Sequence, residues 1–122
     1  LLDKNYFVFI ETNGTLWNEG FKELNTDKLY ITCSPKPPLY FVNKELLPYI
    51  KELKFVVDEN LSINHIIKPD FIDIIRNDVI VLQPESNKPE MVKKALNLQD
   101  QLLQIGIESR IIPQCHKVLG LP

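Results

Sequence analysis

Residues 79–112, VIVLQPESNKPEMVKKALNLQDQLLQIGIESRII, contain the clearest alternation of strand and helix patterns in the chain. The runs at 79–83 and 107–112 are rich in β-branched residues and have the length of strands. Between them, residues 89–105 place apolar side chains at a repeat of about 3.6 residues, which predicts an amphipathic helix. Pro89 suits the first turn of that helix, and Gly106 can adopt the left-handed conformation that ends it. The stretch therefore predicts a strand–helix–strand unit.

Three further apolar runs of strand length precede this unit, at residues 6–10, 29–33 and 53–57. The five runs are continuously apolar more than they are alternating, which is typical of a parallel sheet with helices on both faces. Two weaker helices are predicted between the runs, at residues 43–51 with Asn43 as the cap, and at residues 68–75 with Pro69 in the first turn. The order of elements predicts an α/β fold, either an open sheet or a barrel.

The composition is that of an ordinary globular domain, because 44% of the 122 residues are hydrophobic and 25% are charged. A formal net charge of -2 offers no basic surface to a phosphate backbone, which argues against a nucleic-acid partner. No apolar run approaches the length of a membrane span, about 18 residues, and no export signal precedes the first strand. Two cysteines are too few for a disulfide framework. We therefore expect a cytoplasmic protein without a membrane partner.

Polar clusters follow directly after each predicted strand. They are Glu11-Thr12-Asn13-Gly14-Thr15, Ser34-Pro35-Lys36, Asp58-Glu59, Gln83-Pro84-Glu85-Ser86 and Gln114-Cys115-His116-Lys117. Each also has a plainer interpretation, since Asn-Gly is typical of a turn and a loop lysine is commonly solvated. Parallel sheets and barrels bind ligands at the carboxyl ends of their strands, so the clusters together predict one shared binding face. Gly14 could let a ligand approach the main chain closely.

The cysteines and histidines raise the question of a metal site or a nucleophile. Cys33, Cys115 and His116 lack the short paired spacing of zinc sites, and nothing in the sequence activates a thiol. Cys33 lies inside a predicted strand and is expected to be a small core residue. His65 is expected to be a surface histidine or a hydrogen-bonded loop histidine. We therefore predict no metal ligands in this chain.

Five short blocks occur in one order along the chain: FIETNGT at 9–15, ITCSPK at 31–36, ELKFVV at 52–57, LQP at 82–84 and QCHKVLGLP at 114–122. In order and spacing they resemble the 7-carboxy-7-deazaguanine synthases, a family of radical S-adenosylmethionine enzymes. The first two blocks occur more widely among small radical enzymes, whereas the ending His116-Lys117-Val118-Leu119-Gly120-Leu121-Pro122 is more specific. The resemblance covers nearly the whole chain.

The resemblance implies the parallel-stranded half of a modified, incomplete TIM-type barrel, with residues 1–122 as the C-terminal portion of a single radical S-adenosylmethionine domain. In this family a 4Fe-4S cluster cleaves S-adenosylmethionine, and the resulting radical starts ring contraction of 6-carboxy-5,6,7,8-tetrahydropterin. Ammonia is lost and 7-carboxy-7-deazaguanine forms, on the pathway to queuosine. The family also uses Mg2+ and is typically homodimeric. The implied activity is that of a carbon–nitrogen lyase with a small-molecule pterin substrate.

Site residues are implied by the same resemblance. The S-adenosylmethionine site would be lined by Ser34, Pro35 and Lys36, with a second wall formed by Gln83, Pro84, Glu85 and Ser86. Pro122 would contact the pterin through the chain-terminal carboxylate, which can accept two N–H donors from a guanidine-like edge. The resemblance assigns no catalytic side chain in this chain.

The chain departs from the family pattern at its start. The Cys-x-x-x-Cys-x-x-Cys cluster motif, the magnesium-binding threonine and the glycine-rich motif are expected upstream of Tyr6. We therefore expect this chain to lack the ligands of the cluster and of Mg2+, and to be inactive alone. Two alternatives stay open. One is a related radical S-adenosylmethionine activating enzyme, which would share Ser34-Pro35-Lys36 without needing a terminal carboxylate, and the other is a cluster-free half-barrel that serves as a binding or assembly module.

Overall fold

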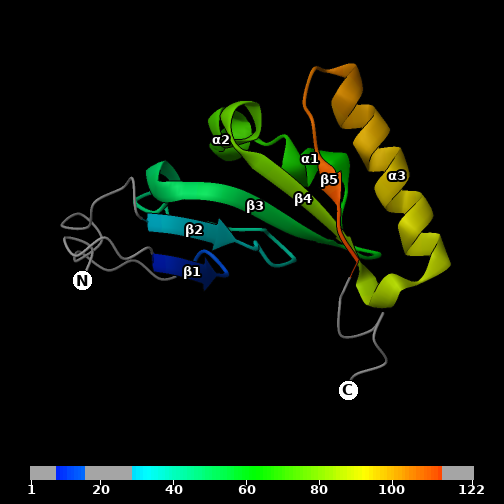
Figure 1. Ribbon diagram of the computed structural model, residues 1–122, viewed down its shortest axis with the longest axis horizontal. Coiled ribbons are helices and arrows are strands. Elements are labelled where there is room, and N and C mark those ends of the chain that lie inside the picture. Colours follow the sequence, from blue (N-terminus) through cyan, green and yellow to red (C-terminus); the bar gives the residue numbers. More distant parts are fainter. Residues whose placement is uncertain (1–7, 16–28, 114–122) are drawn as a thin grey trace.

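The computed structural model describes residues 8–15 and 29–113 (Figure 1). Within these ranges five strands form one sheet in the order β1-β2-β3-β4-β5, and every neighbouring pair is parallel. The strands are β1 (Val8–Thr12), β2 (Leu29–Cys33), β3 (Ile50–Val57), β4 (Val79–Pro84) and β5 (Arg110–Ile111). The chain therefore has the predicted α/β fold, a parallel-stranded half of a TIM-type barrel.

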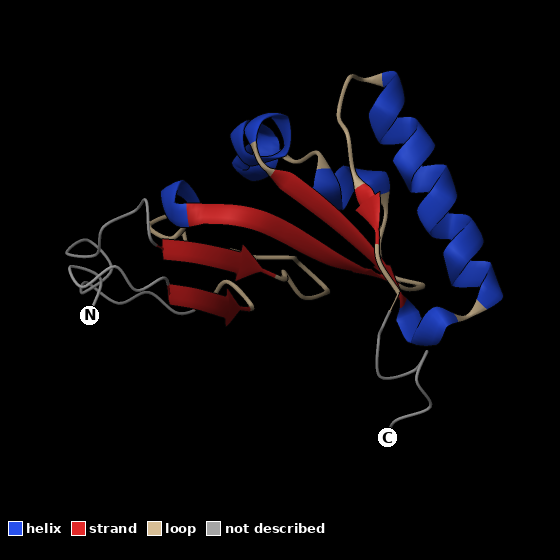
Figure 2. Cartoon of the chain, in the orientation of Figure 1, coloured by secondary structure: helices blue, strands red, loops and turns tan. Residues whose placement is uncertain are grey.

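The described helices lie together on one side of the sheet (Figure 2). They are α1 (Ile63–Ile66), α2 (Ile72–Asn77) and α3 (Pro89–Gln104), with short 3₁₀ helices η4 (Leu47–Tyr49), η5 (Pro69–Phe71) and η6 (Glu85–Asn87). Helices on both faces were predicted from the continuous apolar runs. For the described residues that prediction was wrong, because the described helices cover one face, and the other face carries polar side chains such as Glu11, Lys54 and Gln83 among apolar ones.

The register of the central strands separates the two faces. Leu53 pairs with Ile80 and Phe55 with Leu82, and all four are buried in the core beneath the helices. The intervening positions pair Lys54 with Val81 and Val56 with Gln83. Because partners in a parallel pair share a face, Lys54 and Gln83 point away from the core.

Helix α3 forms where the sequence predicted it. Pro89 occupies its first turn, and Ala95, Leu98 and Leu102 are buried against the sheet. Gly106 has a φ of +82°, and the N–H of Ile107 donates to Leu102 O at 2.9 Å, which satisfies a carbonyl at the helix end.

The connection between β2 and β3 differs from the prediction. The helix expected at 43–51 is a turn followed by η4, and β3 begins at Ile50, three residues before the predicted start at 53. Asn43 does cap a turn, since its Oδ1 accepts the N–H of Glu45 at 2.9 Å. Pro48 lies inside η4, and Ile50 pairs with Ile31, so extended backbone replaces the second helical turn.

The remaining boundaries follow the sequence less closely. The helix predicted at 68–75 is divided into η5 and α2, and the last strand is shortened to Arg110–Ile111. Helix α1 was not predicted, and His65 lies in it rather than in a loop. The Ser62 N–H donates to His65 Nδ1 at 3.0 Å at the start of this single turn. Within the described ranges, no helix has the length and apolar character needed to cross a membrane.

Candidate functional site

A pocket of about 460 Å³ opens at the carboxyl ends of β1, β2, β3 and β4. Its lining residues are Glu11, Thr12, Asn13, Ser34, Lys36, Lys54, Val56 and Gln83. Three of the predicted polar clusters contribute to it, those at 11–15, 34–36 and 83–86. Glu11, Thr12 and Gln83 lie in the last residues of β1 and β4 rather than after these strands, where they had been predicted. Asp58-Glu59 does not line this pocket, and the cluster at 114–117 lies outside the described residues.

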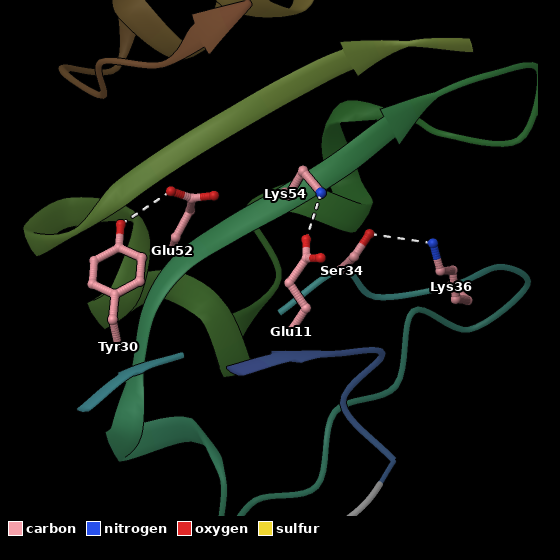
Figure 3. Close-up of polar contacts among 6 residues, drawn as sticks. All are labelled: Glu11, Tyr30, Ser34, Lys36, Glu52 and Lys54. Carbon is pink, nitrogen blue, oxygen red and sulfur yellow. Dashed lines mark hydrogen bonds and ion pairs between the residues drawn. The ribbon is translucent and has the colours of Figure 1, made fainter. Parts of the chain in front are cut away.

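An ion pair crosses the open face of the sheet beside this pocket (Figure 3). Lys54 Nζ of β3 lies 2.8 Å from Glu11 Oε1 of β1, and the side chains are 26% and 73% exposed. The hydrogen bond and the positive charge of Lys54 hold the pKa of Glu11 below its ordinary value. Glu11 is therefore an ionised acceptor at neutral pH.

The loop after β2 supplies a hydroxyl and a second ammonium. Lys36 Nζ donates to Ser34 Oγ at 3.3 Å (Figure 3). The Ser34 N–H donates to Thr12 O at 2.8 Å, and Lys36 O accepts the N–H of Tyr40 at 2.9 Å. The backbone of Ser34 is thus bonded to β1, and the backbone of Lys36 is bonded to Tyr40.

The loop after β1 packs against the loop after β2. Asn13 Oδ1 accepts both the N–H and the hydroxyl of Thr15, at 3.1 and 2.7 Å. Gly14 has a φ of +90°, and a Cβ at that position would meet Val42 Cγ2 at 2.9 Å and Cys33 Sγ at 3.1 Å. The close approach that only glycine permits here is therefore filled by the chain's own side chains.

A second polar contact lies on the same face of β3, away from the pocket (Figure 3). The Tyr30 hydroxyl donates to Glu52 Oε2 at 3.0 Å. Burial, and then the hydrogen bond and charge of Glu52, raise the pKa of Tyr30. Neither residue lines the pocket.

The pocket combines charges of both signs with neutral hydrogen-bonding groups. One carboxylate and two ammonium groups surround the hydroxyl of Ser34 and the amides of Asn13 and Gln83. No cysteine or histidine is among its described lining residues. The arrangement is suited to binding a small polar molecule that carries both charges.

The structure distributes the site residues predicted from the sequence over several environments. Ser34, Lys36 and Gln83 line the pocket, whereas Pro35 and Pro84 are buried outside its lining. Their contacts with S-adenosylmethionine stay a prediction.

Glu85 and Ser86 belong to η6 and also lie outside the pocket lining. Glu85 Oε1 pairs with Lys88 Nζ at 2.9 Å. Pro122 lies outside the described residues. Their roles stay predictions as well.

Lys54 was not proposed from the sequence as a ligand-binding residue, whereas Glu11 was part of a cluster expected on the shared binding face. A signal for Lys54 was present, since it is a charged residue inside the apolar run at 53–57. A charge at such a position indicates that one face of the strand is not in the core.

Cys33 lies on the core side of β2 and is fully buried, as predicted. Burial raises the pKa of its thiol to about 12, so it stays protonated and offers no thiolate to a metal. Among the described residues, no group of three or more His, Cys, Asp or Glu side chains could hold a metal ion. The described residues therefore offer no set of thiolates for a 4Fe-4S cluster.

Two curated proteins match nearly the whole chain. The 7-carboxy-7-deazaguanine synthase of Aquifex aeolicus (strain VF5) is 47% identical over 122 residues, which cover 99% of this chain and 55% of that protein. The 7-carboxy-7-deazaguanine synthase of Rickettsia prowazekii (strain Madrid E) is 31% identical over 124 residues, 99% of this chain and 50% of that protein. The chain thus spans about half the length of the curated relatives it matches. No family model matches the chain, and no solved structure matches it with statistical significance.

Proposed function

Because the chain is related over nearly its whole length to the carboxyl-terminal part of 7-carboxy-7-deazaguanine synthases, we propose that a full-length protein containing it is such an enzyme. It would act as a radical S-adenosylmethionine carbon–nitrogen lyase on 6-carboxy-5,6,7,8-tetrahydropterin. The products would be 7-carboxy-7-deazaguanine and ammonia. We also propose that the enzyme is a cytoplasmic homodimer whose 4Fe-4S cluster and Mg2+ bind outside the described residues.

The observation that supports this proposal is the pocket at the carboxyl ends of β1 to β4. Its volume of about 460 Å³ is that of a small-molecule site. S-adenosylmethionine carries a carboxylate, an ammonium, a sulfonium and a nucleoside, so it needs charges of both signs and neutral donors and acceptors. The lining residues supply all of these. When bound, S-adenosylmethionine supplies the radical that starts the ring contraction.

The side chains of the pocket would bind and orient this molecule. Lys54 is already paired with Glu11, while Lys36 donates to the neutral hydroxyl of Ser34. Lys36 is therefore the better partner for a carboxylate, and Glu11 for a cationic group or a hydroxyl donor. The Gln83 amide can bond a ribose or adenine edge. Val56 gives the pocket an apolar surface from which water is displaced on binding.

A second element of the proposal is the chain-terminal carboxylate of Pro122, which would receive N–H donors of the pterin. Adding one glycine after Pro122 moves that carboxylate by one residue. This extension should abolish product formation while leaving S-adenosylmethionine binding unchanged. A related activating enzyme would tolerate it, so the result separates the two enzyme classes.

The test uses the full-length protein after anaerobic reconstitution with iron and sulfide. Cluster absorbance, S-adenosylmethionine cleavage and formation of 7-carboxy-7-deazaguanine are measured by optical spectroscopy and mass spectrometry. Lys36→Met should weaken S-adenosylmethionine binding by about tenfold, the loss of one charge-assisted contact. The matched control Lys93→Met removes an exposed lysine of α3 outside the pocket lining and should not weaken it. A protein that binds no cluster and cleaves no S-adenosylmethionine would refute the proposal and favour a binding or assembly module.

A further inference from the structure

One lysine connects the helical layer to the loop that forms a wall of the pocket. Lys68, directly before η5, donates through Nζ to Tyr40 O at 2.7 Å and to Leu39 O at 3.3 Å. The same ammonium lies 4.7 Å from the centroid of the Phe71 ring. Its partners are 28 and 29 residues earlier in the chain. The Lys68 ammonium therefore makes long-range hydrogen bonds and does not cap its own helix.

Tyr40 is the point through which this contact reaches the pocket. Its N–H donates to Lys36 O at 2.9 Å, so one residue bonds Lys68 through its carbonyl and Lys36 through its amide. Tyr40 is 1% exposed, and its ring lies 4.4 Å from that of His65 and 6.4 Å from that of Phe55, centroid to centroid. The loop after β2 is thus held by the buried side chain of Tyr40 and by the hydrogen bonds of its backbone N–H and carbonyl.

The backbone of Tyr40 needs such support. Its φ is +52°, in the left-handed region that aromatic residues rarely adopt. A residue in this conformation persists only where its surroundings stabilise it. A cation donating to the carbonyl of Tyr40 is a strong stabilising contact, because hydrogen bonds from charged donors exceed neutral ones in strength.

The second loop of the pocket depends on the same segment. The N–H of Asn43 donates to Gly14 O at 2.7 Å, and Val42 packs against Gly14. A displacement of residues 39–43 would therefore move the backbone beside Asn13 as well as that of Lys36. Both residues line the pocket.

We propose that Lys68 is a positioning residue for the ligand pocket, which holds Lys36 and the loop after β1 in place through Tyr40. Lys68 is not a lining residue and touches no ligand itself. The identity of the ligand rests on the proposed function, whereas the connection from Lys68 to the pocket loops does not.

The experiment compares Lys68→Met, Lys68→Arg and a control, Lys94→Met, in the full-length protein. Lys94 is a matched residue, because it donates from α3 to the backbone carbonyl of Asp58, which lies outside the pocket lining. Isothermal titration gives the Kd for S-adenosylmethionine. Hydrogen exchange of the peptide spanning 36–43, without ligand, reports the amide of Tyr40.

Lys68→Met should raise the Kd about tenfold, which corresponds to about 1.4 kcal/mol, and should speed exchange of the Tyr40 amide. Lys68→Arg keeps a charged donor and should restore both values toward wild type. Lys94→Met should leave both within about twofold, because it removes a lysine-to-carbonyl bond elsewhere.

The inference would be overturned if Lys68→Met kept the wild-type Kd and the wild-type exchange rate of the Tyr40 amide. It would also be overturned if Lys94→Met changed the Kd and the exchange rate equally, because that would indicate a general loss of stability. If the wild-type protein binds no S-adenosylmethionine, the proposed function fails, and the exchange measurement still decides the role of Lys68. If Lys68→Met does not fold, Lys68→Gln replaces it with the same expectations and a smaller change.

Discussion

Replacing Gly14 with alanine should destabilise the protein through two separate effects. The first is conformational, because a φ of +90° is unfavourable for any residue with a Cβ. The second is steric, because that Cβ would lie 2.9 Å from Val42 Cγ2, 3.1 Å from Cys33 Sγ and 3.3 Å from Phe41 O. Val42 and Cys33 are buried, and Val42 is β-branched, so neither side chain has room to turn away.

Gly106 provides a matched control for the conformational effect. Its φ is +82°, and an added Cβ there would meet nothing within 4 Å. Gly106→Ala should therefore cost about 1–2 kcal/mol of unfolding free energy from the backbone alone. Gly14→Ala adds overpacking of a close-packed site, for a total of about 2–5 kcal/mol.

Urea denaturation followed by far-ultraviolet circular dichroism measures both free energies of unfolding. A double variant, Gly14→Ala with Val42→Ala, should recover part of the steric cost, because it removes the nearest atom. Equal destabilisation by Gly14→Ala and Gly106→Ala would refute the steric reasoning. A double variant whose loss is the sum of the two single losses would refute the assignment to Val42.

Lys54→Met should raise the pKa of Glu11 toward its ordinary value, which a carbon-detected NMR titration would show. The ion pair stabilises the fold above the unfolded-state pKa of Glu11, and this stabilisation is lost as pH falls through the folded-state pKa. The stabilisation should be small because Glu11 is mostly exposed. Cys33 should resist alkylation in the native protein at pH 8, where only about one thiol in ten thousand is ionised, and should react on unfolding, as mass spectrometry would record. The pKa of Cys33 is about 12 in the folded state and 9.0 in the unfolded state, so the free energy of unfolding should fall as pH rises above 9. The decrease should be up to about 1.4 kcal/mol per pH unit. Cys33→Ala should remove this contribution to the pH dependence of the free energy of unfolding. Tyr30→Phe should cost about 1 kcal/mol by removing the hydrogen bond to Glu52, and an ultraviolet titration of the wild type should show one phenol, absent from the variant, that ionises above the ordinary range.

The sequence predicted the elements whose signals are local and redundant. Helix α3 has apolar periodicity, an initial Pro89 and a closing Gly106, and each signal indicates the same boundaries. Residues 43–51 have an N-cap and a proline, which suit a first helical turn and an isolated turn equally well. The pairing of Ile50 with Ile31 favours the isolated turn over the helix. This pairing joins two separate strands, so it could not be predicted from the local sequence of either one.

The same distinction applies to the candidate site. Ser34, Lys36 and Gln83 could be predicted because they lie at or just after the carboxyl ends of strands, and the ends of parallel strands share an edge. Lys54 and Glu11 could not be joined in advance, since their contact depends on the register of three strands and on which face of β3 lies in the core. The alternation of Glu52 and Lys54 with buried neighbours contained part of that information.

The ion pair of Glu11 and Lys54 also has a mechanical meaning. It spans β2 and joins strands whose axes are about 10 Å apart, two strand spacings. On the concave face of a curved sheet, side chains of β1 and β3 come closer together as the curvature increases. They move apart as the sheet flattens, which would break the ion pair. Among the described strands, β1 pairs only with β2, so the ion pair is a direct side-chain link from β1 to β3. Flattening of the sheet would therefore separate these two charges.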